Sequence, residues 1–202
     1  MKMPFFASFI IFLIWLAYEI AKARRGSAAL EESFWEKEAR ANQTRRKSLD
    51  NLNYITIPLD YLPTEILKDN EKVKEYSNLL LSLSESPIVN FSGLSNTDLK
   101  LEYGVANITL LMQYDQNYTI LARTLQQWAE LLYQENYRTE AQHLLEFAIS
   151  TDTDVSGTYR LLAQIYCEEN DSDKINALLA RAENLKSGSK NIIVRALKEF
   201  DR

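Results

Sequence analysis

The sequence has few glycines, prolines, cysteines and histidines, and these shortages exclude several classes of protein. Its 202 residues include five glycines, four prolines, one cysteine and one histidine. The glycines lie far apart, so no glycine-rich phosphate loop or dinucleotide-binding fingerprint can form. A single Cys167 and a single His143 cannot make a disulfide framework, a zinc finger or a histidine metal cluster. We therefore expect no metal and no cofactor.

What remains favours an all-α protein with an acidic body. Hydrophobic residues make up 46% of the chain and charged residues 25%. A leucine-rich sequence with little glycine or proline is typical of helices. The net charge of −5 divides into +3 for residues 1–25 and −8 for residues 26–202. We expect no nucleic-acid partner, because phosphate contacts need concentrated lysine and arginine.

The first residues predict a membrane anchor. Pro4 to Tyr18 carry no charge, and a helix from Met3 to Ala21 would span roughly 28 Å, close to the ~30 Å of a bilayer's hydrocarbon core. Trp15 lies near one end of this stretch, where aromatic rings favour the membrane interface. We expect a transmembrane helix that contacts the lipid bilayer through residues 3–21, within an anchor and basic flank formed by residues 1–25.

A cleaved signal peptide is the alternative for this segment, since Ala21-Lys22-Ala23 has the form of a cleavage site. Arg24 and Arg25 would then open the mature chain with only Lys2 ahead of them, which favours an uncleaved anchor. More lysine and arginine follow the apolar segment than precede it. The positive-inside rule therefore predicts a single-pass protein of the cell membrane with its carboxy-terminal domain in the cytoplasm.

Residues 26–62 predict a juxtamembrane helix followed by an extended connector. Residues 27–41 are rich in helix formers and either continue the membrane helix or dock on the body. Residues 54–57 are β-branched and aromatic, and Pro58 restrains them, so we expect residues 51–62 to pack along the body in an extended form.

Residues 63–121 predict a degenerate helical layer. The apolar spacing predicts a helix over 63–84 and a second helix from about Ser95. The alternation of Leu99, Leu101 and Tyr103 leaves a strand open as the alternative for that second segment.

An internal repeat begins near position 122. When the chain is aligned with itself at an offset of 34 residues, AELLYQEN (residues 129–136) matches AQIYCEEN (residues 163–170). The same offset aligns further pairs: Thr124 with Thr158, Trp128 with Leu162, Ala141 with Ile175, Leu144 with Leu178, Leu145 with Leu179 and Ala148 with Ala182. The pattern predicts two helix-turn-helix units, at residues 122–155 and 156–189.

These units resemble tetratricopeptide repeats, a helix-turn-helix family whose period of about 34 residues equals the offset between the two segments. Alanines such as Ala129 and Ala163 stand where the family's paired helices approach closely. Asn136 and Asn170 replace the family's turn glycine, and asparagine tolerates the left-handed backbone that such a turn needs. The closing proline of each repeat is absent. The resemblance implies a short α-solenoid built from residues 122–189.

Such a stack needs about three layers and a polar cap. We expect residues 63–121 to supply the missing layer and residues 190–202 to form a capping helix. Two other segments, residues 34–63 and 96–118, resemble a family of membrane-anchored proteins from Gram-positive anaerobic bacteria. That second resemblance implies no activity.

The tetratricopeptide resemblance also implies where a partner would bind, because the first helix of each repeat lines the family's concave surface. By position, the residues of this partner-binding set are Arg123, Gln126, Glu130, Tyr133, Arg160, Gln164 and Glu168. An ordinary solvated face is the alternative interpretation. His143 is expected to be a solvated or a packing histidine, and Cys167 a partly buried structural thiol.

We therefore expect a membrane-anchored, non-catalytic adaptor or scaffold that binds a protein or peptide in the groove of a tetratricopeptide-like domain. The first alternative is an envelope-assembly protein with the same fold and an outward-facing body. The second is an enzyme hidden in residues 51–113, where the sequence has no cluster of ionisable groups that would form a catalytic pocket.

Overall fold

The structure is a computed structural model that describes the backbone of residues 4–200 and the side chains of residues 8–22 and 31–200. Every regular element in this part of the chain is a helix, which confirms the all-α prediction, and one isolated β-bridge joins Tyr54 to Val89. The chain divides into two compact units, one made of Met1–Lys47 with Asn96–Asn107 and the other of Ser48–Ser95 with Ile108–Arg202.

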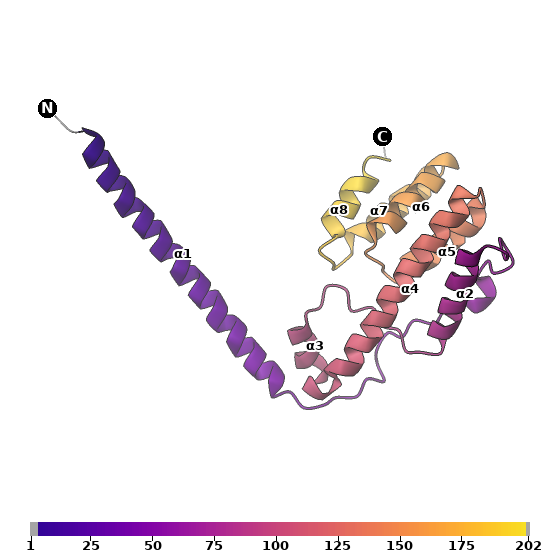
Figure 1. Cartoon of the computed structure of the whole chain (residues 1–202), viewed down its shortest axis with the longest axis horizontal. Coiled ribbons are helices and arrows are strands. Elements are labelled where there is room, and N and C mark those ends of the chain that lie inside the picture. Colours follow the sequence, from indigo (N-terminus) through magenta and orange to yellow (C-terminus); the bar gives the residue numbers. More distant parts are fainter. Residues whose placement is uncertain (1–3, 201–202) are drawn as a thin grey trace. The chain divides into compact units, whose positions relative to one another are not determined.

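Figure 1 labels the α-helices of both units. Those of the first unit are α1 (Pro4–Asn42) and α3 (Asn96–Tyr103). Those of the second unit are α2 (Glu71–Ser84), α4 (Ile108–Gln134), α5 (Arg138–Ser150), α6 (Ser156–Glu168), α7 (Ser172–Glu183) and α8 (Lys190–Leu197). Two short 3₁₀ helices cover Leu59–Tyr61 and Val105–Asn107.

Helix α1 is unbroken over 39 residues, so the helix predicted at 27–41 continues directly from the one before it. Large apolar side chains from Phe9 to Ile20 are exposed along it. None of the described helices combines the length and the hydropathy that a membrane span requires, so the predicted transmembrane helix receives no support here. The predicted span starts at Met3, and the side chains of residues 1–7 lie outside the described residues.

The carboxy-terminal end of α1 is joined to α3 by charged contacts. Lys37 Nζ lies 2.7 Å from the Oδ1 atom of Asp98. Glu38 accepts hydrogen bonds from the ammonium group of Lys100 and, at 2.7 Å, from the hydroxyl of Thr97. These contacts hold α3 with α1, although the sequence assigned it to the layer at 63–121.

The second unit begins with the connector, and part of it packs on the core as predicted. Ile57 is 4% exposed and belongs to the main apolar core, and the amide of Ile55 donates to the carbonyl of Ile88 at 2.9 Å. The helix predicted over 63–84 was too long, since α2 starts only at Glu71. Leu67 has a left-handed φ of 53°, and the side chain of Asn70 caps α2 by accepting from the amide of Lys72.

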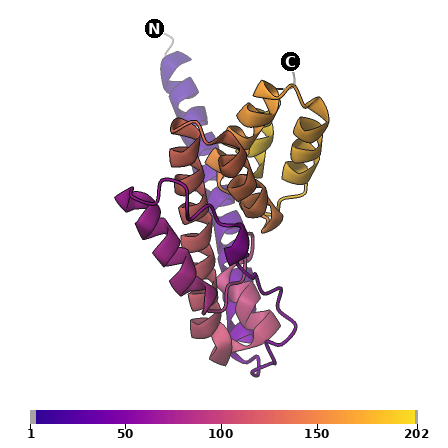
Figure 2. The same cartoon turned by 90° about the vertical axis from the view of Figure 1, so that its right-hand side faces the viewer.

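The repeat register recurs in the tertiary structure. The aligned pairs at 124/158, 128/162, 129/163, 141/175, 144/178 and 148/182 are buried at both positions. Helices α4 and α5 pack side by side, as do α5 and α6 and then α6 and α7, while α2 lies along α4 (Figure 2). The predicted start of the first repeat at 122 lies inside α4, which begins at Ile108.

The two turns within the repeats adopt the same backbone. Asn136 and Asn170 have left-handed φ values of 68° and 59°. The next amide in each turn, that of Tyr137 or Asp171, donates at 2.9 Å to a carbonyl five residues earlier. This agrees with asparagine substituting for glycine, because its side chain tolerates that conformation better than most.

Helix α8 packs on the last repeat as the sequence predicted. Ile193 and Leu197 are fully buried against the core. Ile192 on the opposite side is 66% exposed. This helix therefore covers apolar surface of α6 and α7 and presents its remaining face to solvent.

Candidate functional site

Three of the predicted partner-binding residues form one polar cluster at the ends of α4 and α6. The hydroxyl of Tyr133 donates to the carboxylate of Glu168, and the amide of Gln164 donates to Tyr133 at 2.7 Å. Arg138 lies 3.3 Å from the second oxygen of Glu168. The Tyr133 hydroxyl, with Gln164 and Arg138, holds the pKa of Glu168 below its usual value.

Three others lie apart from that cluster. Gln126 accepts a 2.9 Å hydrogen bond from the hydroxyl of Thr158, so it links α4 to α6. Glu130 is exposed and faces Tyr76 of α2, whose pKa is raised by burial and by nearby carboxylates. Arg160 is exposed and forms no ion pair within the described residues.

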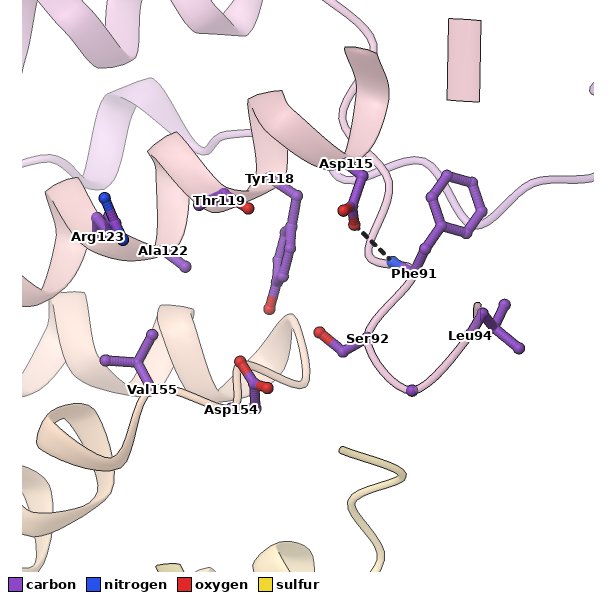
Figure 3. A pocket seen from close by; sticks show the side chains of 11 residues that line it. Phe91, Ser92, Leu94, Asp115, Tyr118, Thr119, Ala122, Arg123, Asp154 and Val155 are labelled. Atoms are coloured by element: carbon purple, nitrogen blue, oxygen red, sulfur yellow. Dashed lines mark hydrogen bonds between the residues drawn. The ribbon is translucent and has the colours of Figure 1, made fainter. Parts of the chain in front are cut away.

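Arg123 lines a cavity of about 430 Å³ within the second unit (Figure 3). The cavity is bounded by α4, by the start of α6 and by the loop from Phe91 to Leu94. In Figure 3 the side chains of Tyr118 and Ser92 point into the space beside Asp154. Its full lining is Phe91, Ser92, Gly93, Leu94, Asp115, Tyr118, Thr119, Ala122, Arg123, Asp154 and Val155.

The loop that closes this cavity is fixed by contacts to distant parts of the unit. The side chain of Asn90 donates to the carbonyls of Thr151 and Asp152 at 2.9 and 3.0 Å. Gly93 has a φ of 86°, and a Cβ atom there would lie 2.7 Å from the carbonyl oxygen of Lys186. Only glycine lets the backbone at position 93 approach the backbone of Lys186 this closely. This approach, together with the hydrogen bonds of Asn90, positions the loop in the cavity wall.

The cavity carries two half-buried carboxylates. Asp115 accepts a hydrogen bond from the amide of Phe91 at 3.4 Å, and Asp154 accepts one from the hydroxyl of Ser187. Burial raises the pKa of Asp115, and the nearby charge of Asp154 adds to this shift. Neither carboxylate forms an ion pair with any residue that the structure describes.

Of the residues that line this cavity, only Arg123 belongs to the set predicted from the sequence. Asp115 and Tyr118 precede the predicted first repeat, which was taken to start at 122 rather than inside a longer helix. The loop at 91–94 contains no motif. Its contact with Asp115 joins residues 24 positions apart, which no local pattern reveals.

Two other expectations concern single reactive residues. His143 is exposed, as expected. The prediction that Cys167 is partly buried was wrong, because it is exposed. Tyr133 occupies the position in the first repeat that aligns with Cys167 in the second. The side chain of Tyr133 is long enough to reach Glu168 on α6, whereas the short side chain of Cys167 ends close to its own backbone. Nowhere in the described residues do three His, Cys, Asp or Glu side chains group closely enough to hold a metal ion.

The chain matches no protein-family model, no curated protein and no solved structure.

Proposed function

We propose that this protein is a membrane-anchored, non-catalytic adaptor whose second unit is a short tetratricopeptide-like solenoid that binds a protein or peptide. The main observation behind this proposal is the cavity lined by Arg123, a residue of α4, the first helix of the repeats. It combines a cation, two carboxylates, hydroxyls and apolar side chains on neighbouring elements. A small number of polar groups set in an apolar wall is typical of a binding site.

The repeated register supports the solenoid. Buried positions of the first repeat recur at the aligned positions of the second, and both repeat turns use an asparagine with left-handed φ. Stacked helical units of this kind leave the faces of their first helices open to solvent. Arg160 and Gln164 of α6 are exposed on such a helix, together with Arg123 and Glu130 of α4.

The exposed apolar side chains of α1 support the anchor. Ten large hydrophobic residues from Phe9 to Ile20 are exposed, and an apolar surface of that kind is typical of contact with lipid or protein. An anchor would hold the bound partner in two dimensions and so raise its local concentration. The basic residues after the apolar segment favour a cytoplasmic second unit.

The orientation can be measured by protease protection of a carboxy-terminal tag. We expect the tag to survive protease on intact cells and to be digested after detergent lysis. Digestion on intact cells would place the second unit outside and favour the envelope-assembly alternative.

Partner binding can be tested by reversing two exposed charges of the predicted set. The full chain, carrying a photo-crosslinker at Gln164, should crosslink a discrete partner in its native membrane. In the double variant Arg123→Glu with Arg160→Glu we expect at least ~10-fold less crosslinked product, because each favourable contact to an anionic or carbonyl group becomes repulsive.

The matched control is Lys72→Glu with Lys74→Glu, which makes the same change of charge at exposed positions of α2. This control should crosslink as the unmodified chain does. Equal helicity of the two variants by circular dichroism shows that the fold is retained. Full crosslinking by the Arg123/Arg160 variant would refute binding through this face.

A further inference from the structure

The cavity beside Arg123 is lined by two carboxylates that form no ion pair within the described residues. Asp115 and Asp154 come from different elements, one from α4 and the other from the turn before α6. Each accepts a hydrogen bond, but no lysine or arginine of the described residues pairs with either of them. Two half-buried carboxylates that repel each other gain most from a shared cation.

The rest of the cavity wall suits a long side chain that ends in a cation. In Figure 3 the hydroxyl end of Tyr118 points toward Asp154 and Ser92. The Tyr118 side chain is 4% exposed and its hydroxyl donates to the carbonyl of Thr151 at 3.2 Å, so its oxygen can still accept a hydrogen bond from a cationic group. Leu94 and Val155 add apolar surface on opposite sides of the cavity, so an aliphatic stem can pack on one of them. The volume of about 430 Å³ exceeds what one lysine or arginine side chain needs, so part of the adjoining peptide backbone can enter as well.

Arg123 is the only cationic residue among the described residues that line the cavity. Arg123 lies at the end of the cavity opposite Asp115 in Figure 3 and is exposed. A ligand's cationic group is therefore repelled by Arg123 and attracted to the carboxylates, whereas a carbonyl oxygen of the same ligand's backbone can contact Arg123. The net charge of −8 on residues 26–202 draws basic ligands to this part of the chain in general.

We propose that this cavity is a specificity pocket for the lysine or arginine side chain of a peptide partner. The proposal rests on the proposed function, because it names the chemistry of the partner bound beside Arg123. The ammonium or guanidinium group lies in the space lined by Asp115 and Asp154, and Ser92 and Tyr118 contribute hydroxyl oxygens there.

The test is a titration of the ¹⁵N-labelled full chain, in neutral detergent micelles, with two pentapeptides that differ in one charge. The first is acetyl-Ala-Ala-Arg-Ala-Ala-amide, and the second has citrulline, a neutral isostere, in place of arginine. We expect the arginine peptide to shift the amide signals of Gly93 and Leu94 to saturation, with at least ~10-fold tighter binding than the citrulline peptide.

The variants Asp115→Asn and Asp154→Asn should each weaken binding of the arginine peptide about 5-fold to 10-fold, because they keep the shape of the side chain and remove its charge. Asp173→Asn, an exposed residue at the start of α7, is the matched control and should change nothing. Raising the salt concentration should weaken the arginine peptide selectively.

Equal binding of the two peptides, or unchanged binding in both cavity variants, would overturn the proposal. So would spermidine displacing the arginine peptide at a lower concentration than that peptide's own Kd, since the cavity would then be a polyamine site. If a variant does not fold, two measurements on the unmodified chain still test the proposal. These are the difference in affinity between the arginine and citrulline peptides and the dependence of arginine-peptide binding on salt. These results do not depend on the crosslinking of a cellular partner, so either proposal can fail alone.

Discussion

Replacing Trp128 with alanine should lower the free energy of unfolding of the second unit by about 3–5 kcal/mol. Trp128 is fully buried in the core, and its ring centroid lies 6.5 Å from that of Tyr76 on α2. Truncation would leave a cavity between α4 and its neighbours that those rigid helices cannot fill. Chemical denaturation of the full chain in neutral detergent, followed by circular dichroism, measures the loss.

Two controls separate core packing from other effects of the substitution. Trp35→Ala removes an indole that is 59% exposed and should change stability by no more than ~0.5 kcal/mol. Trp128→Phe should cost less than Trp128→Ala, because it keeps most of the ring and removes an indole N–H that is buried without an acceptor. A loss below about 1 kcal/mol for Trp128→Ala would contradict the assigned core.

Replacing Gly104 with alanine should destabilise the first unit locally by about 2–4 kcal/mol. Gly104 has a φ of 89°, and a Cβ atom there would lie 2.3 Å from the carbonyl oxygen of Arg45. Relief of that clash would separate the neighbouring backbone segments, including the 3.0 Å hydrogen bond from the amide of Lys47 to the carbonyl of Tyr103.

Hydrogen exchange detects this change directly. We expect the amide of Lys47 to lose most of its protection in the Gly104→Ala variant. Gly188→Ala is the matched control, because an added Cβ atom at Gly188 meets nothing within 4 Å, and its exchange pattern should equal that of the unmodified chain. Unchanged protection of Lys47 in Gly104→Ala would show that the backbone does not approach Gly104 this closely.

The predictions from sequence succeeded where local periodicity decides the structure. The repeat register indicated α5, α6 and α7, because the spacing of apolar residues fixes which face of each helix is buried. Asn136 and Asn170 identified both turns for a local steric reason, the left-handed backbone. The predictions failed at the ends of α2 and α4. Asn70 caps the amino terminus of α2, so this helix starts later than predicted. Helix α4 starts earlier than the predicted repeat, because no proline or glycine interrupts residues 108–121.

The candidate site was foreseen only in part. Tyr133, Gln164 and Glu168 come together because Gln164 and Glu168 are one turn apart on α6 and Tyr133 occupies the corresponding end of α4. Asp115 and Asp154 were not foreseen, because their role depends on where the loop at 91–94 lies. No local feature of residues 91–94 predicts that placement.

By itself the sequence determined the all-α class, the repeat register of the second unit, a helix over residues 27–41 and the apolar run that opens the chain. Only the structure showed that the helix over 27–41 continues the preceding one without a break. Only the tertiary structure decided that α3 belongs with α1, and that a loop, α4 and the turn before α6 enclose a cavity. The all-α class and the repeat register follow from apolar residues spaced three or four positions apart, a local pattern that can be found in the sequence. The contacts between Lys37 and Asp98, or between Asn90 and Thr151, join residues 61 positions apart. Because such contacts form only when the backbone brings the partners together, no pattern along the chain reveals them.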